Sequence, residues 1–413
     1  MLTQQLANAK LAARTLASIP LADRNGILNA MESLLETNAA AILEANGEDI
    51  RRAEAAEIPP ARLSRLRLTP EKLQGLRASL ASLRQAPDPL GSGRLWKTVH
   101  GITLEQIRVP LGVIGIIYES RPGVTVEAVA LAIKSGNAII LRGGREADTS
   151  NALLASLWHQ ALKENGLPSS LVVMLDDPDR HLARELMHLP GLDLLIPRGG
   201  AGLIQDVVAN ATVPVIETGV GNCHLYVDQA ADLDMALNIL EDGKVSSPAV
   251  CNALETLLVH QSLKDHWLPM AYARLKPYGV VWHGDPTVCG LIEAYPAEES
   301  DWAEEYLGLH LAARVVDDFD QALEHIAQYG SHHSEAIVTE HYSIGQRFLA
   351  EVDAAVVYWN ASTRFSDGFQ FGYGGEMGIS TQKLHARGPM GPEALTTVKT
   401  LARGAGHTRD LPQ

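Results

Sequence analysis

The sequence predicts an α/β protein that contains two domains, each built around a parallel β-sheet. The first observation behind this prediction is that short apolar runs alternate with helical patterns from Pro110 onward, and the second is that the same alternation resumes after Asp242. The third is the length of 413 residues, which suits two or three domains because one hydrophobic core rarely grows beyond about 250–300 residues.

The chain is predicted to begin with helices. Apolar side chains recur at spacings of three and four residues over residues 1–85. Thr69 and Pro70 mark the start of one helix, because a threonine side chain caps the first turn and the missing N–H of proline costs nothing there. The Pro- and Gly-rich residues 86–93 are predicted to form a loop.

Two further segments are predicted to be strands outside the alternating pattern. Residues 96–99 and 102–109 flank the dipeptide His100-Gly101 and indicate a hairpin. Residues 394–401 near the C-terminus contain β-branched side chains, which favour a strand.

Both alternations predict parallel sheets covered by helices. In the first, strands are expected at 111–117, 138–141, 171–175, 194–196 and 213–216, with helices at 124–135, 149–165, 180–188 and 201–210. In the second, strands are expected at 254–260, 311–316, 336–339 and 354–359, with helices at 263–275, 319–328 and 343–352. Ligands bind beyond the carboxyl ends of the strands in such sheets. The segments to inspect for a site are therefore 118–123, 142–145, 198–202 and 217–221.

Charge and cysteine content exclude several classes of protein. The chain has 34 Lys and Arg against 49 Asp and Glu, and this net charge of −15 argues against nucleic acid or an anionic membrane as the partner. The three cysteines form neither a disulfide framework nor a zinc motif and indicate a reducing compartment. Adjacent His332 and His333 point apart and have no further ligands at a suitable spacing, so no metal site is predicted. With no signal-peptide pattern and no apolar run near the ~18 residues of a membrane span, a cytoplasmic protein is expected.

Cys251 is the candidate nucleophile. It lies in the sequence SSPAVCNA, residues 246–253, where a proline and small residues could open a helix and place the thiol near backbone N–H donors. Such a position lowers the pKa of a thiol and supplies part of an oxyanion hole. The alternative is a buried structural cysteine, but the junction of the two predicted domains favours the nucleophile. Cys223 and Cys289 lack this context and are interpreted as structural or incidental.

The nucleotide-binding signals are individually weak. The motif G-x-G-x-x-G is absent, which argues against an ordinary dinucleotide-binding fingerprint. However, the sequences RGGR at 142–145 and RGG at 198–200 both follow predicted strands. Glycine lets a phosphate approach the backbone, and arginine pairs bidentately with phosphate oxygens. The alternative for each is a tight strand–helix turn with solvated arginines.

Two other regions contain residue types suited to chemistry. Glu217 ends a predicted strand ahead of Gly219 and Gly221, where its carboxylate could act as a base, orient a cofactor or simply form a salt bridge. Residues 360–391 are dense in glycine, arginine and hydroxyl groups. Long segments of this kind line binding sites more often than they form plain surface loops.

Taken together, these motifs resemble a known family. In chain order they are VPLGVIG (109–115), YESRP (118–122), IPRGG (196–200), VIETG (215–219), SPAVCN (247–252) and GGEMGISTQKLHARGP (374–389). The chain is similar over nearly its whole length to the gamma-glutamyl phosphate reductases, also called glutamate-5-semialdehyde dehydrogenases, of the aldehyde dehydrogenase superfamily. The last motif is the most specific.

The resemblance implies an aldehyde-dehydrogenase-like α/β fold with two Rossmann-like parallel-sheet domains and a small β oligomerisation element. The expected cofactor-binding domain comprises residues 1–94 and 110–242, the catalytic domain 243–383, and the oligomerisation element 95–109 and 384–413. A homo-oligomer, either dimer or tetramer, is expected. A transient contact with glutamate 5-kinase is a further expectation, which rests on the ready cyclisation of glutamyl phosphate and on no residue of the sequence.

The activity implied by the resemblance is the NADPH-dependent reduction of L-glutamyl 5-phosphate to L-glutamate 5-semialdehyde and phosphate, the second step of proline biosynthesis from glutamate. Cys251 is the implied nucleophile, which forms a thioacyl intermediate. Glu217 occupies the superfamily's glutamate position. Arg121 stands where most aldehyde dehydrogenases have an oxyanion-hole asparagine, and a cation there suits phosphate as the leaving group.

The resemblance also implies which residues bind the ligands. Arg142 is expected near the adenine ribose and Glu305 at the nicotinamide ribose, and Arg142 with Arg145 favours NADPH over NADH. The remaining cofactor-binding candidates are Gly143, Arg198, Gly199, Gly200 and Gly219. The substrate-binding candidates are Ser120, Arg121, Arg364, Gly375 and Ser380.

Two rival functions stay open on the sequence alone. A hydrolytic aldehyde dehydrogenase would use Glu217 to activate water and would need no phosphate. A catalytically silent dinucleotide-binding protein would turn over no acyl phosphate, although Cys251 and the dense terminal segment argue against it.

Overall fold

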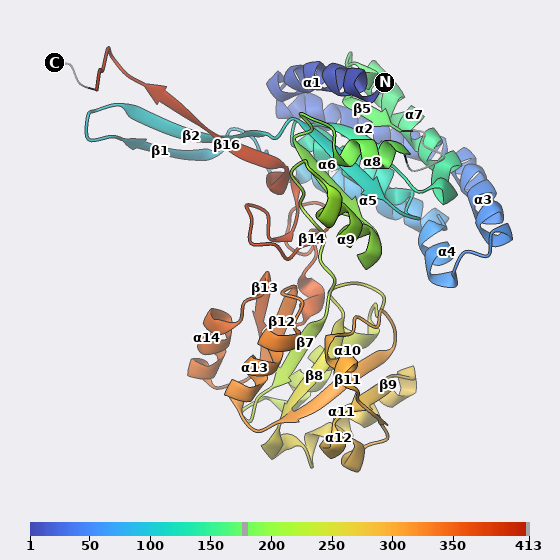
Figure 1. The fold of residues 1–413 in the computed structure, drawn as a ribbon, viewed down its shortest axis with the longest axis vertical. Helices are drawn as coiled ribbons and strands as arrows, with labels where there is room; N and C mark the ends of the chain where they lie inside the picture. Colours follow the sequence, from blue (N-terminus) through green and yellow to red (C-terminus); the bar gives the residue numbers. More distant parts are fainter. Residues whose placement is uncertain (176–180, 410–413) are drawn as a thin grey trace. The chain divides into compact units, whose positions relative to one another are not determined.

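The computed structural model describes residues 1–175 and 181–409 and divides into two compact units. The first unit comprises Met1–Glu217, Gly372–Gly378 and Met390–Gln413, and the second comprises Thr218–Phe371 and Ile379–Pro389. Each unit contains a parallel sheet, and a separate three-stranded antiparallel sheet is also present (Figure 1). The predicted fold class is confirmed.

The predicted boundary after residue 242 is not where the structure divides the chain. Strand β7 (Cys223–Val227) and helix α10 (Leu233–Val245) belong to the second unit. β7 pairs on one side with β8 (Leu254–His260) and on the other with β12 (Ser334–Val338). The sequence pattern predicts no strand at 223–227, so it does not reveal that this segment joins the second sheet.

The first unit begins with the predicted helices. They are α1 (Leu2–Ser18), α2 (Leu21–Thr37), α3 (Ala39–Ala55), α4 (Pro60–Leu66) and α5 (Pro70–Gln85). The start predicted at Thr69-Pro70 is confirmed, because the Thr69 side chain accepts a hydrogen bond from the Lys72 N–H at 3.2 Å. This bond satisfies one of the N–H groups that have no partner inside a helix.

Replacing Thr69 by alanine is expected to lower the free energy of unfolding by about 1 kcal/mol, because the Lys72 N–H loses its acceptor. Urea denaturation would measure this loss. Thr69→Ser keeps the oxygen and should restore most of the stability. Equal stability of Thr69→Ala and the original chain would contradict the capping role.

The sheet of the first unit has the strand order β5-β4-β3-β6, and its pairs are all parallel. Its strands are β3 (Val113–Tyr118), β4 (Ala138–Arg142), β5 (Val172–Met174) and β6 (Leu194–Arg198). The accompanying helices are α6 (Gly123–Lys134), α7 (Asp148–Glu164), α8 (His181–Met187) and α9 (Ala201–Asn210). Residue 180, the predicted start of the third helix, lies outside the described residues. The strand predicted at 213–216 is wrong, because only a single bridge between Val215 and Leu195 forms there.

The predicted hairpin and C-terminal strand form one antiparallel sheet. Strands β1 (Gly93–Lys97), β2 (Thr103–Pro110) and β16 (Thr396–Arg403) lie in the order β1-β2-β16. Figure 1 shows them as a long arm that extends away from the helices of the first unit. We call these three strands the β arm.

The second unit contains a seven-stranded sheet in the order β10-β9-β11-β8-β7-β12-β13, in which the pairs are parallel. Besides β7, β8 and β12, its strands are β9 (Val281–Gly284), β10 (Tyr295–Pro296), β11 (His310–Val316) and β13 (Val356–Trp359). Its other helices are α11 (Trp267–Leu275), α12 (Pro286–Leu291), α13 (Phe319–Tyr329) and α14 (Tyr342–Glu351). A short ribbon of β14 (Ile379–Ser380) and β15 (Gly388–Pro389) also belongs to this unit.

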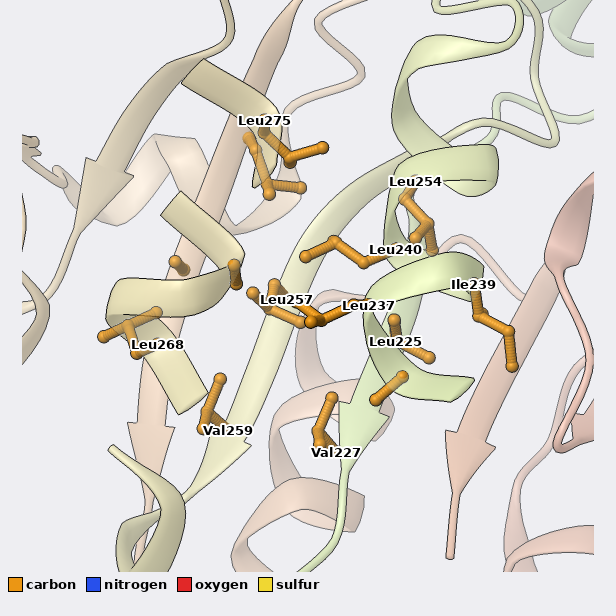
Figure 2. Packing of buried hydrophobic residues seen from close by; sticks show 14 of the residues in the cluster. Leu225, Val227, Leu237, Ile239, Leu240, Leu254, Leu257, Val259, Leu268 and Leu275 are labelled. Atoms are coloured by element: carbon orange, nitrogen blue, oxygen red, sulfur yellow. The ribbon is translucent and has the colours of Figure 1, made fainter. Parts of the chain in front are cut away.

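Helices cover both faces of this sheet. Residues 225 and 227 of β7 pack with α10, α11 and α12, whereas residue 226 packs with α13 and α14. This division follows from the strand geometry, because successive side chains point to opposite faces. Figure 2 shows part of the first core, in which Leu237 and Leu240 of α10 belong to the same cluster as Leu225 and Leu257 of the central strands. The central strands are therefore rigid supports for the loops at their ends.

Among the described residues, the structure contains no helix with the length and apolar character needed to cross a membrane.

Candidate active site

The carboxyl edge of the first sheet brings three of the predicted site segments together. The strand ends at Tyr118, Arg142 and Arg198 belong to β3, β4 and β6, which are neighbours in the sheet and run parallel. Successive strands progress from β3 through β4 to β5, whereas β6 pairs on the other side of β3. The sheet therefore reverses its strand order between β3 and β6, and open α/β sheets bind ligands at such a reversal.

Ser120 lies at the end of β3 in a constrained conformation. Its φ of 42° is in the left-handed region that residues other than glycine rarely adopt, and its side chain is buried. The Ser120 N–H donates to Glu146 Oε1 at 2.8 Å, and the Ser120 hydroxyl donates to the same oxygen. Glu146 therefore fixes the turn from which the neighbouring half-buried Arg121 projects.

The second strand end, at Arg142 of β4, is followed by Gly143, where space for a side chain is limited. An added Cβ at Gly143 would lie 2.2 Å from Asn151 Nδ2 and 3.1 Å from the Tyr118 hydroxyl. A side chain at this position would require the buried Asn151 side chain to move. Arg142 is 7% exposed, whereas Arg145, in a 3-10 turn, is exposed. Of these two arginines, Arg145 is the one accessible to a ligand from solvent.

The third strand end is tied to the first by Glu119. The Glu119 N–H donates to the Arg198 carbonyl at 3.1 Å, and Glu119 Oε2 accepts from the Gly200 N–H at 3.3 Å. Space around Gly200 is open, since an added Cβ would meet nothing within 4 Å. Gly200 is also the N-cap of the ten-residue helix α9, whose first N–H groups favour an anion.

Cys251 lies in the second unit, within the connection between α10 and β8. The helix that the sequence suggested at this point does not form, so the expectation of a helix N-terminus beside the thiol is wrong. Residues 246–253 instead make turns, because only this short segment links the end of α10 to the start of β8. The side chain of Cys251 is half-buried.

The peptide of Cys251 is tightly held by neighbouring residues. The Cys223 thiol donates to the Cys251 carbonyl oxygen with 3.3 Å between sulfur and oxygen. Gly221 also packs closely against this carbonyl, because an added Cβ at Gly221 would lie 1.6 Å from the Cys251 oxygen. Burial raises the pKa of Cys223 well above its usual range, so this thiol stays protonated and remains a donor. Cys223 is therefore not an incidental core cysteine.

Arg364 and Asn252 brace the other side of the same connection. The Arg364 Nε donates to Ser246 Oγ at 3.0 Å, and its guanidinium also donates to Asn252 Oδ1. The Asn252 amide donates to the Ser366 carbonyl at 2.9 Å, and Thr363 Oγ1 donates to the Asn252 carbonyl at 2.7 Å. Arg364, which was predicted to bind substrate, supports the turn that contains Cys251.

Glu305 also contacts this group of residues. Its Oε1 accepts the Gly221 N–H at 2.7 Å, which links Glu305 to the glycine that abuts the Cys251 carbonyl. The Gly219 N–H donates to the Ile379 carbonyl at 2.9 Å, next to Ser380. Glu305 and Cys251 are therefore linked through Gly221, two residues after Gly219.

The structure contains a buried ion pair near this site that the sequence analysis missed. Lys244 and Glu255 are both 0% exposed, and Lys244 Nζ lies 2.6 Å from Glu255 Oε2. Burial raises the pKa of Glu255 to about 7, although the neighbouring Lys244 acts to lower it. A signal was present in the sequence, because a glutamate within the apolar run 254–260 of a buried strand requires a partner.

The remaining predicted residues divide between the two units. Glu217 is the last residue of the first unit before the chain enters the second. Gly375 also belongs to the first unit, where it lies near Ser79 of α5 and Leu131 of α6. Ser380 belongs to the second unit and pairs with Gly388 in the β14–β15 ribbon.

Comparison with known proteins identifies the family. The model of the aldehyde dehydrogenase family matches residues 2–293. The chain is 50% identical over 404 residues to the gamma-glutamyl phosphate reductase of Clostridium novyi and 51% identical over 404 residues to that of Moorella thermoacetica, and each alignment covers 97% of both chains. The chain belongs to the gamma-glutamyl phosphate reductases of the aldehyde dehydrogenase family.

Solved structures agree with this family membership. The gamma-glutamyl phosphate reductase of Thermotoga maritima is 42% identical, with a TM-score of 0.95 over 98% of this chain and 99% of that one. An acetylating aldehyde dehydrogenase from Geobacillus thermoglucosidasius has a TM-score of 0.73 at 17% identity, over 99% of this chain and 97% of that one. At this low identity, the similarity to the acetylating aldehyde dehydrogenase shows a shared fold only. The resemblance stated from the sequence motifs is confirmed.

Proposed function

We propose that this gamma-glutamyl phosphate reductase family member reduces L-glutamyl 5-phosphate to L-glutamate 5-semialdehyde and phosphate with NADPH, through a thioacyl intermediate on Cys251. The main support is that about half of the residues, over 97% of the chain, are identical to those of gamma-glutamyl phosphate reductases. The braced position of Cys251 supports its role as nucleophile, because a nucleophile must be held in one geometry to attack productively.

The proposed covalent steps use Cys251. Its thiolate attacks the acyl carbonyl carbon, the bond from that carbon to the phosphate oxygen breaks, and phosphate leaves with the bonding electrons. Bound NADPH supplies the hydride that reduces the resulting thioester. When the carbon–sulfur bond then breaks, the semialdehyde leaves and Cys251 regains its thiolate. The positive charge of Arg121 is proposed to stabilise the departing phosphate.

Water activation has no place in these steps, so Glu217 need not act as a general base. We propose that it positions neighbouring groups. The glutamyl end of the substrate is proposed to bind Ser120, Arg364, Gly375 and Ser380, of which Arg364 supplies a positive charge for a carboxylate.

The first unit is proposed to bind NADPH at the carboxyl edge of its sheet. Arg198, Gly199 and Gly200 fit the phosphates by backbone access and charge, and Arg142 with Gly143 fits the adenine ribose. We propose that the exposed Arg145 contacts the 2′-phosphate that distinguishes NADPH from NADH.

Replacing Arg145 by alanine is therefore expected to raise KM for NADPH by about 10- to 100-fold, the loss expected for one hydrogen bond to a charged group. KM for NADH should stay within about 2-fold, because NADH lacks the 2′-phosphate. Steady-state kinetics with both cofactors would measure the ratio. Equal losses with NADPH and NADH would contradict this role for Arg145.

The proposed reaction is best tested in reverse. The assay follows the reduction of NADP⁺ by glutamate semialdehyde, supplied in its cyclic form, with and without phosphate, and acetaldehyde is the control substrate. Activity that requires phosphate and is absent with acetaldehyde supports the proposal. Activity that persists without phosphate would indicate a hydrolytic dehydrogenase with Glu217 as base. Failure with either substrate would overturn the proposed enzymatic function.

We further propose that the β arm joins copies of this chain into a dimer or tetramer. Both outer strands, β1 and β16, present an edge, and such edges pair readily with other strands. The arm also exposes apolar side chains, since Leu95 of β1 is 68% exposed and Val398 of β16 is 53% exposed.

Replacing Val398 by glutamate is expected to reduce the oligomer to a smaller species, because a charge would have to be buried in the contact. Light scattering coupled to size-exclusion chromatography would measure the mass. Val99→Glu is the control, because Val99 lies in the turn of the hairpin and is 96% exposed. An unchanged mass for Val398→Glu would contradict the proposed interface.

A further inference from the structure

The buried ion pair of Lys244 and Glu255 has a third partner. Lys244 Nζ donates to Glu255 Oε2 at 2.6 Å and to the Leu254 carbonyl at 2.7 Å. The other carboxylate oxygen, Glu255 Oε1, accepts the backbone N–H of Leu307 at 3.2 Å. A buried ion pair is often no more stabilising than apolar residues of similar size, so stability alone does not explain this pair.

Leu307 has a backbone conformation that needs such support. Its φ of 51° lies in the left-handed region, which disfavours a side chain with a Cβ. A residue other than glycine persists there when surrounding contacts hold it. The hydrogen bond from Glu255 is one such contact, and it acts on the backbone itself.

The segment held at Leu307 includes Glu305. Two residues before Leu307, the Glu305 carboxylate accepts the Gly221 N–H at 2.7 Å. Gly221 abuts the Cys251 carbonyl, which the Cys223 thiol contacts from 3.3 Å. A continuous series of contacts thus leads from the ion pair to the peptide of the proposed nucleophile, within the second unit.

We propose that Lys244 and Glu255 are positioning residues, which hold the Leu307 backbone and thereby fix the Glu305 carboxylate for the nicotinamide ribose beside Cys251. Both side chains are fully buried, so the proposed role acts through the backbone. Lys244 orients the Glu255 carboxylate through its hydrogen bond to Oε2, and Glu255 holds the backbone through Oε1. This inference rests on the proposed function through the ribose-binding role of Glu305.

Two matched double variants separate positioning from packing. Both replace the lysine by methionine, which removes the buried positive charge. K244M/E255Q keeps an oxygen that can accept the Leu307 N–H, whereas K244M/E255L replaces that oxygen with apolar groups of similar size. Both are expected to fold, because neither leaves an unpaired buried charge. Their thermal unfolding midpoints would be compared with that of the original chain.

The dissociation constant for NADPH is expected to rise about 10-fold or more in K244M/E255L, since small misplacements of a binding group are costly. In K244M/E255Q it should stay within about 3-fold, because the backbone acceptor is retained. NADPH fluorescence would measure both constants. Alkylation of Cys251 by iodoacetamide is the control for an intact site, and its rate should be similar in both variants.

Near-original affinity in both variants would overturn the inference, and so would an equal loss in both. A measurement that needs no variant is amide hydrogen exchange on the original chain without cofactor. The Leu307 amide should exchange at least about 10-fold more slowly than an unprotected amide, because it is hydrogen-bonded to a buried group. Rapid exchange would overturn the inference even if K244M/E255L fails to fold.

Failure of this inference is distinguishable from failure of the proposed function. Suppose that the original chain reduces NADP⁺ only in the presence of phosphate, but the two double variants bind NADPH equally well. The proposed function is then supported, and the positioning role is contradicted. If the original chain shows neither this activity nor NADPH binding, the proposed function itself is contradicted.

Discussion

Replacing Cys251 by alanine is expected to abolish the reduction of glutamyl phosphate while NADPH binding is unchanged. In the proposed reaction the thiolate forms the bond that displaces phosphate, and no other group replaces it. Loss of a catalytic nucleophile lowers kcat by about four orders of magnitude or more. Stopped-flow or steady-state measurement of NADPH oxidation would give kcat, and NADPH fluorescence would give the dissociation constant.

Cys289→Ala is the matched control for this prediction. Cys289 lies in α12, and its thiol donates to the Gly284 carbonyl from 3.3 Å, a contact within the packing of the second unit. Its loss should leave kcat within about 3-fold, because the hydrogen bond of this thiol is made to Gly284 of β9 and not to the Cys251 turn. Substantial turnover by Cys251→Ala would exclude the covalent route, whatever the control shows.

Replacing Gly221 by alanine is expected to cause the second largest loss of activity. An added Cβ would lie 1.6 Å from the Cys251 carbonyl oxygen, 2.4 Å from its carbonyl carbon and 2.7 Å from its Cα. These are backbone atoms, so the turn that contains the thiol must move. A displacement of about 1 Å at a reacting group can lower kcat/KM by about 100-fold.

Gly290→Ala provides the matched control, because an added Cβ at Gly290 meets nothing within 4 Å. Thermal unfolding should accompany the kinetics of both variants, so that loss of activity is compared at equal fraction folded. Gly221→Ala with unaltered kcat/KM would show that the position of the Cys251 peptide does not control the reaction.

The sequence determined most of the local structure. Helices over residues 1–85 and the start at Thr69-Pro70 followed from apolar spacing and capping, which depend on nearby residues only. Strand β8 occupies Leu254–His260, the same residues as predicted. The family was also recognised from short motifs, above all that at 374–389, because such motifs combine residue types that the chemistry requires.

Pairing between strands was decided only by the tertiary structure. The sequence pattern predicts no strand at 223–227, yet β7 forms there and lies inside the second sheet between β8 and β12. Periodicity reports which face of a strand is buried and contains no information about the neighbouring strand. The predicted boundary after residue 242 was wrong for this reason.

The support of the candidate site likewise depends on residues far apart in the chain. Lys244, Glu255 and Leu307 meet through hydrogen bonds across as many as 52 positions, and Cys223 contacts the Cys251 carbonyl across 28. Sequence spacing predicts contacts within one helix or hairpin, whereas these contacts arise from the packing of several elements. The sequence by itself therefore determined the fold class, the family and the nucleophile candidate. Tertiary structure decided which buried groups hold that nucleophile in place, because burial and hydrogen bonding are properties of the packed chain.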